Sequence, residues 1–127
     1  RPPRSTLFPY TTLFRSSVTA TDFSRFQITD LCSLLSNALE NAIHACAQIT
    51  YPEGRYINLK LYEKNEQLCI NLANSYEEEP AFENDIPVSH KSGHGFGVQS
   101  MISVVNKYSG IYGFFAQNGE FRFQATF

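Results

Sequence analysis

The sequence is poor in charged residues, in cysteine pairs and in long apolar runs, and each scarcity excludes a class of protein. Charged residues make up 17% of the 127 residues and apolar residues 43%, a balance that favours a packed core over a disordered chain. The longest apolar stretches fall well short of the roughly 18 residues that a membrane-spanning helix needs. The length fits one domain with a single hydrophobic core.

The small numbers of basic residues and cysteines argue against nucleic-acid binding and against a disulfide framework. Three of the ten basic residues are Arg1, Arg4 and Arg15, so residues 17–127 keep seven basic and twelve acidic residues, a net charge of −5. A nucleic-acid binder normally carries a basic stripe, so we expect no nucleic-acid partner, and a phosphate ligand would need a local site. Three cysteines without a C-x-x-C pair argue against a disulfide framework and are typical of a reducing, cytosolic setting.

Residues 1–16 differ from the rest of the chain. The string RPPRSTLFPYTTLFRS is basic, contains prolines and repeats Thr-Leu-Phe. It resembles a translated sequencing adapter, so we predict a non-native leader over 1–16 and exclude it from the fold as one would exclude a tag. A genuine N-terminal strand or linker is the alternative. The folded domain is then expected over 17–127.

The rest of the sequence predicts helices and strands in alternation. Residues 30–48 are rich in Leu and Ala and lack Gly and Pro, which predicts a helix with Thr29 or Asp30 as its N-cap. Apolar and polar residues alternate in three later segments, and a fourth, 111–116, is strand-like, which predicts two β-hairpins. The expected elements are an extended segment over 18–28, the helix over 30–48, strands over 56–62 and 67–73, a helix from Val98 closed by Gly110 at C′, and strands over 111–116 and 120–127. This order predicts one mixed sheet with helices on one face.

Residues 75–92 have no periodicity and carry the acidic run Glu77–Glu79 and two prolines. Such a long loop without secondary structure is usually functional in a small domain, and we predict a lid here.

Polar side chains form a narrow stripe along the edge of the 30–48 helix. Asn37, Asn41 and His44 lie beside its broad apolar face at about 100° per residue. Because amides are poor helix formers, two of them four residues apart in a helix suggest a functional role. Solvated or capping amides are the alternative.

A glycine-rich segment, GHGFG at 93–97, opens the second helix. Glycines let backbone N–H groups approach an anion, and the helix N-terminus adds partial positive charge. The segment matches neither the dinucleotide fingerprint nor the G-x-x-x-x-G-K phosphate loop, so a flexible hinge remains an alternative. Asn74, where the 67–73 strand is expected to end, could satisfy a donor and an acceptor of a purine edge or could be a turn residue.

Together these motifs resemble the Bergerat ATP-binding fold of the gyrase, heat-shock chaperone, histidine kinase and MutL (GHKL) superfamily. NALENAIHA on a helix, a strand ending in Asn, a lid, and GHGFGV opening a second helix carry the resemblance, which covers 18–127. It is nearest to the catalytic domain of quorum-sensing histidine kinases of the accessory-gene-regulator sensor type. The resemblance implies an α/β (α+β) two-layer sandwich whose mixed, mostly antiparallel sheet carries helices on one face.

The resemblance assigns roles to the polar stripe. Asn41 matches the Mg²⁺ ligand of the family's Asn box, a role suited to an oxygen ligand. Asn37 occupies the position of the glutamate base of hydrolysing members; an amide cannot take a proton from water, so the sequence favours transfer over hydrolysis. His44 stands where many kinases have Lys or Arg, and it is a weaker phosphate donor at neutral pH.

The remaining ATP-binding residues also follow from the resemblance. Asn74 replaces the aspartate that reads the adenine amino group, and the Asp-x-Gly-x-Gly box is absent, which implies modest ATP affinity. A metal pair of His90 and His94 is not expected. The second glycine box and its neighbours that are expected to contact ATP are Lys91, Gly93, His94, Gly95, Phe96, Gly97 and Val98.

The implied function is to bind Mg²⁺ and ATP and to supply the γ-phosphoryl group to a histidine on a dimerisation helix. The implied partners are that helix and a downstream response regulator, and no membrane contact is expected of this domain, which would be the cytoplasmic part of a membrane-anchored sensor. The three histidines lie in the Asn box and the lid, so the acceptor histidine is expected elsewhere. A nucleotide-sensing or partner-docking module is the alternative, as is a coincidental resemblance, which predicts that the asparagines and glycines are scattered in space.

Overall fold

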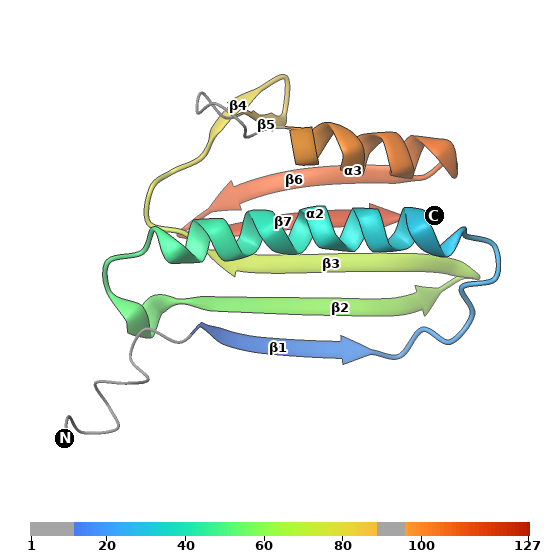
Figure 1. The fold of residues 1–127 in the computed structure, drawn as a ribbon, viewed down its shortest axis with the longest axis horizontal. Coiled ribbons are helices and arrows are strands. Elements are labelled where there is room, and N and C mark those ends of the chain that lie inside the picture. Colours follow the sequence, from blue (N-terminus) through green and yellow to red (C-terminus); the bar gives the residue numbers. More distant parts are fainter. Residues whose placement is uncertain (1–11, 89–95) are drawn as a thin grey trace.

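A computed structural model of the chain describes residues 12–88 and 96–127, in which a five-stranded sheet carries two helices on one face (Figure 1). The helices are α2 (Ile28–Ala47) and α3 (Phe96–Lys107), and a 3-10 helix, η1 (Pro52–Gly54), follows α2. The sheet contains, in spatial order, β1 (Leu13–Val18), β2 (Tyr56–Lys64), β3 (Gln67–Ser75), β7 (Glu120–Thr126) and β6 (Ile111–Gln117). Only β1 and β2 pair in parallel within this sheet. The predicted fold class is confirmed.

Tight turns with two residues at positive φ join the antiparallel strands. Asn65 and Glu66 connect β2 to β3, and Asn118 and Gly119 connect β6 to β7. Two consecutive positive φ values are the mark of type I′ turns, whose twist matches that of the paired strands.

The segment expected to be a loop without secondary structure contains a third hairpin. Strands β4 (Ala81–Glu83) and β5 (Ile86–Val88) pair across a turn at Asn84 and Asp85, both at positive φ. Phe82 and Ile86 pack against the core. The prediction of a structureless 75–92 is therefore wrong for 81–88, while 89–92 lie outside the described residues.

The core lies between the sheet and the two helices. α2 buries the apolar face that its sequence predicts, with Leu35 and Leu39 partly buried at its margin. Each fully buried Leu or Met stabilises the fold by roughly 1.5–3 kcal/mol. The main residues of the core are Leu31, Leu34, Ala38, Ala42, Cys46, Ile57, Leu59, Leu61, Leu68, Ile70, Leu72, Val98, Met101, Val104, Val105, Phe114, Phe123 and Ala125. Among the described helices, none is long and apolar enough to cross a membrane.

β1 lies at the sheet edge, and all six of its residues are exposed. It pairs with β2 from Leu13 to Val18. The last four residues of the predicted leader, 13–16, are therefore paired in the sheet, where they contribute main-chain hydrogen bonds and no core side chain. The non-native origin of 1–16 stays a prediction, and residues 1–11 lie outside the described residues.

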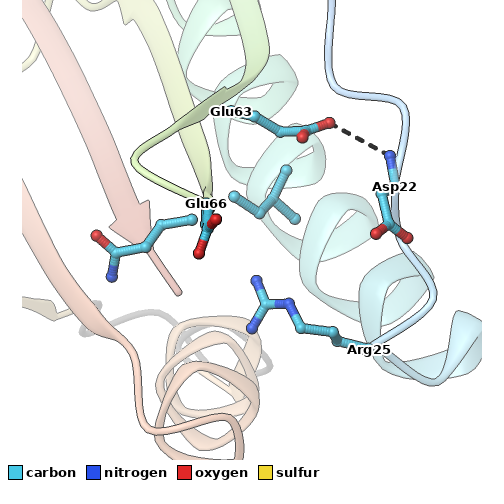
Figure 2. A pocket seen from close by; sticks show the side chains of 6 residues that line it. Asp22, Arg25, Glu63 and Glu66 are labelled. Carbon is cyan, nitrogen blue, oxygen red and sulfur yellow. Dashed lines mark hydrogen bonds between the residues drawn. The ribbon is translucent and has the colours of Figure 1, made fainter.

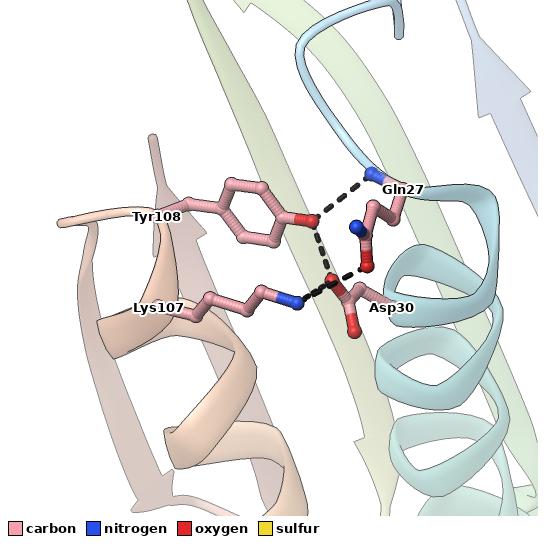
Figure 3. Close-up of polar contacts among 4 residues, drawn as sticks. All are labelled: Gln27, Asp30, Lys107 and Tyr108. Atoms are coloured by element: carbon pink, nitrogen blue, oxygen red, sulfur yellow. Dashed lines mark hydrogen bonds and ion pairs between the residues drawn. The ribbon is translucent and has the colours of Figure 1, made fainter.

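The start of α2 is tied to the end of α3 by a group of polar contacts, shown in Figure 3. The carboxylate of Asp30 accepts hydrogen bonds from the Lys107 ammonium at 2.8 Å and from the Tyr108 hydroxyl. The Tyr108 hydroxyl in turn accepts the Gln27 backbone N–H at 3.0 Å. Gln27 is the N-cap, so the predicted cap at Thr29 or Asp30 is wrong: Asp30 lies within the helix and binds the other helix instead.

These contacts predict a pH dependence of stability. The hydrogen bonds from Lys107 and then Tyr108 hold the pKa of Asp30 below its ordinary value of 3.8. A carboxyl with a lowered folded-state pKa stabilises the fold above the unfolded pKa and loses this effect as the pH falls through the folded-state value. We expect Asp30→Asn to lower the free energy of unfolding at pH 7, measured by urea denaturation, and the deficit to shrink below about pH 3.8. A deficit that stays constant down to pH 2 would contradict the ionic origin of the contact.

The end of α3 differs from its predicted form by one residue. Ser109, not Gly110, takes the positive φ at C′, and the Gly110 N–H donates to the Val105 carbonyl at 2.9 Å. This is a Schellman arrangement with Gly110 at C″. Gly110 is needed because a Cβ there would lie 2.8 Å from the Thr126 carbonyl oxygen.

Candidate functional site

The N-terminus of α3 packs against Asn37 of α2. A Cβ added to Gly97 would lie 3.1 Å from Oδ1 of Asn37, so the glycine allows an unusually close approach of the two helices. Nδ2 of Asn37 donates to the backbone carbonyl of Ser33 at 2.9 Å, which directs Oδ1 toward α3. The Asn box and the last glycine of the glycine box are thus in contact.

Asn41 lies one turn further along α2, and its side chain is exposed. Its Nδ2 donates to Sδ of Met101 at 3.7 Å, and Met101 is itself 1% exposed in α3. A thioether accepts weakly and cannot donate, so this contact points Nδ2 toward the core and leaves Oδ1 as the outward acceptor. His44, the third residue of the polar stripe, is also exposed.

This oxygen fits the role of a single protein ligand to Mg²⁺. Magnesium keeps several waters and is usually bound by one or two protein oxygens together with substrate phosphates. Across residues 12–88 and 96–127, no three His, Cys, Asp or Glu side chains gather as a metal cage. If Mg²⁺ binds with a nucleotide, Oδ1 of Asn41 would hold it, and the ion would neutralise phosphate charge.

Asn74 is 2% exposed within β3. The strand does not end at residue 73 as expected, because pairing with β7 continues through Ser75 opposite Glu120, and the Tyr76 N–H donates to the Gly119 carbonyl. Asn74 follows the core residues Ile70 and Leu72 at intervals of two along β3, so all three face the helix layer. It is a strand residue and not a turn residue.

α2 covers this end of β3. The buried thiol of Cys46, in the last turn of α2, lies 3.8 Å from the Ser75 carbonyl oxygen and 3.3 Å from that of Tyr56. The helix with the Asn box therefore contacts both α3 at Gly97 and the strand end beside Asn74. Whether the asparagines and all three glycines line one cleft stays a prediction, because Gly93 and Gly95 lie outside the described residues.

Only part of the glycine box can be described. Gly97 and Val98 lie in the first turn of α3, and Val98 is buried. Phe96 begins the helix. Lys91, Gly93, His94 and Gly95 lie outside the described residues, so their contacts with a triphosphate stay predictions.

Two surface hollows lie away from these residues. One, of about 390 Å³, lies beside Asp22, Arg25 and Glu63, whose side chains are drawn in Figure 2. Two of its charged side chains already bind the backbone: Glu63 accepts the N–H groups of Thr21 and Asp22, which lowers its pKa, and Arg25 donates to the Phe127 carbonyl. Glu66 also lines the hollow, and we assign the hollow no chemistry.

The second hollow, of about 600 Å³, lies on the sheet face opposite the helices and includes Tyr56, Glu120 and Arg122. The Tyr56 hydroxyl donates to Glu120 at 2.7 Å, and burial followed by this bond raises the pKa of Tyr56 to about 12. Arg122 pairs with the same carboxylate at 2.6 Å. The three groups satisfy one another, so we assign the hollow no chemistry.

Comparison with known proteins agrees with this geometry. The family profile described as GHKL domain matches residues 26–127. The catalytic domain of histidine kinase ThkA superposes with a TM-score of 0.70 at 16% identity, covering 97% of this chain and 84% of that one. Histidine kinase AdeS from Acinetobacter baumannii gives a TM-score of 0.64 at 11% identity, covering 97% of this chain and 57% of AdeS. None of the curated proteins compared matches the sequence.

The chain belongs to the GHKL domain family. Within that family its fold is that of histidine kinase catalytic domains, as a blue-light activated histidine kinase domain from Erythrobacter litoralis also shows with a TM-score of 0.68 at 13% identity, covering 91% of this chain and 50% of that one.

Proposed function

We propose that this domain binds Mg²⁺ and ATP and positions the γ-phosphoryl group for transfer to a histidine on a dimerisation helix. The observation that carries the proposal is the contact between Asn37 and Gly97, which joins the Asn box to the glycine box, with Oδ1 of Asn41 left outward one turn away. In such transfers the protein supplies positioning and charge neutralisation more than covalent chemistry.

Each candidate residue has a role in this proposal. Asn41 holds the metal, and Asn37, which cannot act as a base, leaves water unactivated so that transfer is favoured over hydrolysis. Asn74 accepts a hydrogen bond from the base. His44, Lys91 and His94 donate to phosphates. We further propose a cytosolic domain of a quorum-sensing kinase whose phosphoryl group passes to a response regulator.

A nucleotide-sensing module is the second candidate. The neutral amide of Asn74 and the histidine at 44 both favour weaker nucleotide binding than a carboxylate and a permanent cation would give. The two candidates share nucleotide binding and differ in phosphotransfer.

Calorimetry tests the shared step. We expect ATP to bind in the presence of Mg²⁺ with a dissociation constant on the order of 0.1 mM, and the heat released as ATP is titrated into the protein measures this binding. Addition of a dimerisation helix bearing its histidine should then yield phosphohistidine, and the same helix with glutamine at that position is the control. No heat at millimolar ATP contradicts both candidates, whereas binding without transfer favours the sensing module.

A further inference from the structure

Strand β6 forms one edge of the sheet. Among the described strands it hydrogen-bonds to β7 alone, so its other side has no strand partner in that part of the chain. Proteins usually protect such an edge with a charged residue, a proline or a bulge. β6 has the sequence IYGFFAQ, without charge or proline, and its pairing with β7 runs one to one from Ile111 to Gln117, without a bulge. This edge is therefore suited to pairing with another strand.

Two large apolar side chains lie exposed on β6. Ile111 is 72% exposed and Phe115 is 53% exposed, and their spacing along the strand places both on the sheet face opposite the helices. The Phe115 ring lies over Gly113 of its own strand, because a Cβ at Gly113 would lie 2.7 Å from a ring carbon. Aromatic rings that cover edge glycines stabilise strand pairs. A strand that offers a ring to Gly113 and a glycine to Phe115 would fit this edge.

β6 is itself such a strand. When two copies pair antiparallel about Phe114, Gly113 of each copy lies opposite Phe115 of the other. Tyr112 then lies opposite Ala116, so both kinds of ring meet a small residue. Centring the pair on Phe115 instead would place the two exposed rings against each other. The order of large and small side chains along β6 therefore favours one register of self-pairing.

The helix layer also allows a second copy to approach. α3 runs along β6 (Figure 1), and helical spacing places Gln99, Ile102 and Asn106 on the side of α3 away from α2. These three residues are uncharged, whereas Lys107 is directed toward α2 by its ion pair with Asp30. Two-fold pairing of β6 keeps both helix layers on the same face of the joined sheet. The two α3 helices would then approach each other without like charges between them.

We propose that two copies of this chain pair through β6, in an antiparallel, two-fold arrangement centred on Phe114 that joins their sheets. A contact of one strand and one helix side is smaller than a standard interface, so we expect a weak dimer with a dissociation constant on the order of 100 µM. Unfolding measured at about 1 µM protein, well below this constant, reports on the single chain. The inference does not depend on the proposed nucleotide binding.

Sedimentation equilibrium measures the association. The average mass of the full chain is expected to rise from that of one copy toward that of two between about 10 µM and about 1 mM protein. Phe115→Lys removes the ring and places like charges across the two-fold axis, so it should weaken association about tenfold or more. Ile43→Lys is the matched control, because Ile43 is 58% exposed on α2, away from β6, and its loss should leave association unchanged. Circular dichroism checks folding, and Phe115→Glu replaces a Phe115→Lys protein that does not fold.

Disulfide trapping tests the register. Because positions 113 and 115 are opposite in the proposed pair, a mixture of Gly113→Cys and Phe115→Cys should form a cross-linked heterodimer with oxidised glutathione. A mixture of Ile111→Cys and Phe115→Cys is the control, since the register offsets these two positions along the strands and the cross-link should form more slowly. All three variants carry Cys32→Ser, because Cys32 is exposed.

Three results would overturn the proposal. One is a wild-type chain that stays a single copy up to about 1 mM. Another is association that Phe115→Lys or its replacement leaves intact, or that Ile43→Lys removes, since the interface would then lie elsewhere. The third is equal cross-linking of the two cysteine mixtures, which would contradict the two-fold pairing centred on Phe114.

Discussion

Replacing Asn41 by alanine is expected to reduce phosphotransfer to a dimerisation helix by at least about 100-fold, the usual cost of losing one preorganised group that stabilises developing charge. The change removes the outward Oδ1, the proposed Mg²⁺ ligand, and only a weak hydrogen bond to Met101. Alanine is the better helix former, and the side chain it replaces is exposed. Phosphohistidine formed from radiolabelled ATP measures the effect, and circular dichroism is expected to show an unchanged fold.

The neighbouring residue provides the control for this experiment. Glu40 is exposed on the same turn of α2, so Glu40→Ala changes charge on the helix surface without touching the proposed ligand. We expect it to retain transfer within about twofold, as surface substitutions away from a site usually have small effects. Full activity of Asn41→Ala would exclude this asparagine as the metal ligand.

Local sequence pattern was sufficient for the main elements of the fold. The 3.6-residue spacing of apolar positions predicts α2, and the period of two predicts the two principal hairpins, because one face of each element is buried against the other layer. Strands of three residues, such as β4 and β5, are too short to show a period. Their turn, with Asn84 followed by Asp85, was the available signal.

The helix ends could not be predicted for a different reason. Asp30 has the composition of an N-cap, but its partners Lys107 and Tyr108 are more than seventy residues away along the chain. Gly110 is required by contact with Thr126, again from a distant element. At such positions tertiary contacts override the local propensity of the residue.

In the candidate site, too, local sequence pattern predicts some features, whereas others depend on tertiary contacts. Helical spacing places Asn37 and Asn41 on one side of α2, but their neighbours Gly97 and Met101 follow only from the packing of α3. The single methionine of the chain is recognisable in sequence as an apolar helix residue and not as a partner of an asparagine. Likewise, that Phe121 lies opposite Asn74 follows only from the register of β3 and β7.

Replacing Phe123 by alanine is expected to have the largest effect on stability. Phe123 is 2% exposed in β7, between Leu72 of β3 and Phe114 of β6 in the register, with its ring 5.2 Å from that of Phe114. Truncation of a buried phenylalanine costs about 3–5 kcal/mol, since the neighbours only partly fill the cavity. That is a large share of the roughly 5–15 kcal/mol by which a domain is stable.

Urea denaturation would measure this loss, and thermal unfolding should show Tm lowered by more than about 10 °C. Phe115→Ala is the matched control, because Phe115 is 53% exposed on the other face of the neighbouring strand and its loss should cost less than about 1 kcal/mol. The two substitutions remove the same atoms from adjacent strands, so their difference isolates burial in the layer between sheet and helices. Equal losses would mean that this layer does not hold the sheet against α2 and α3, and the contact between Asn37 and Gly97 would then lack the support that positions it.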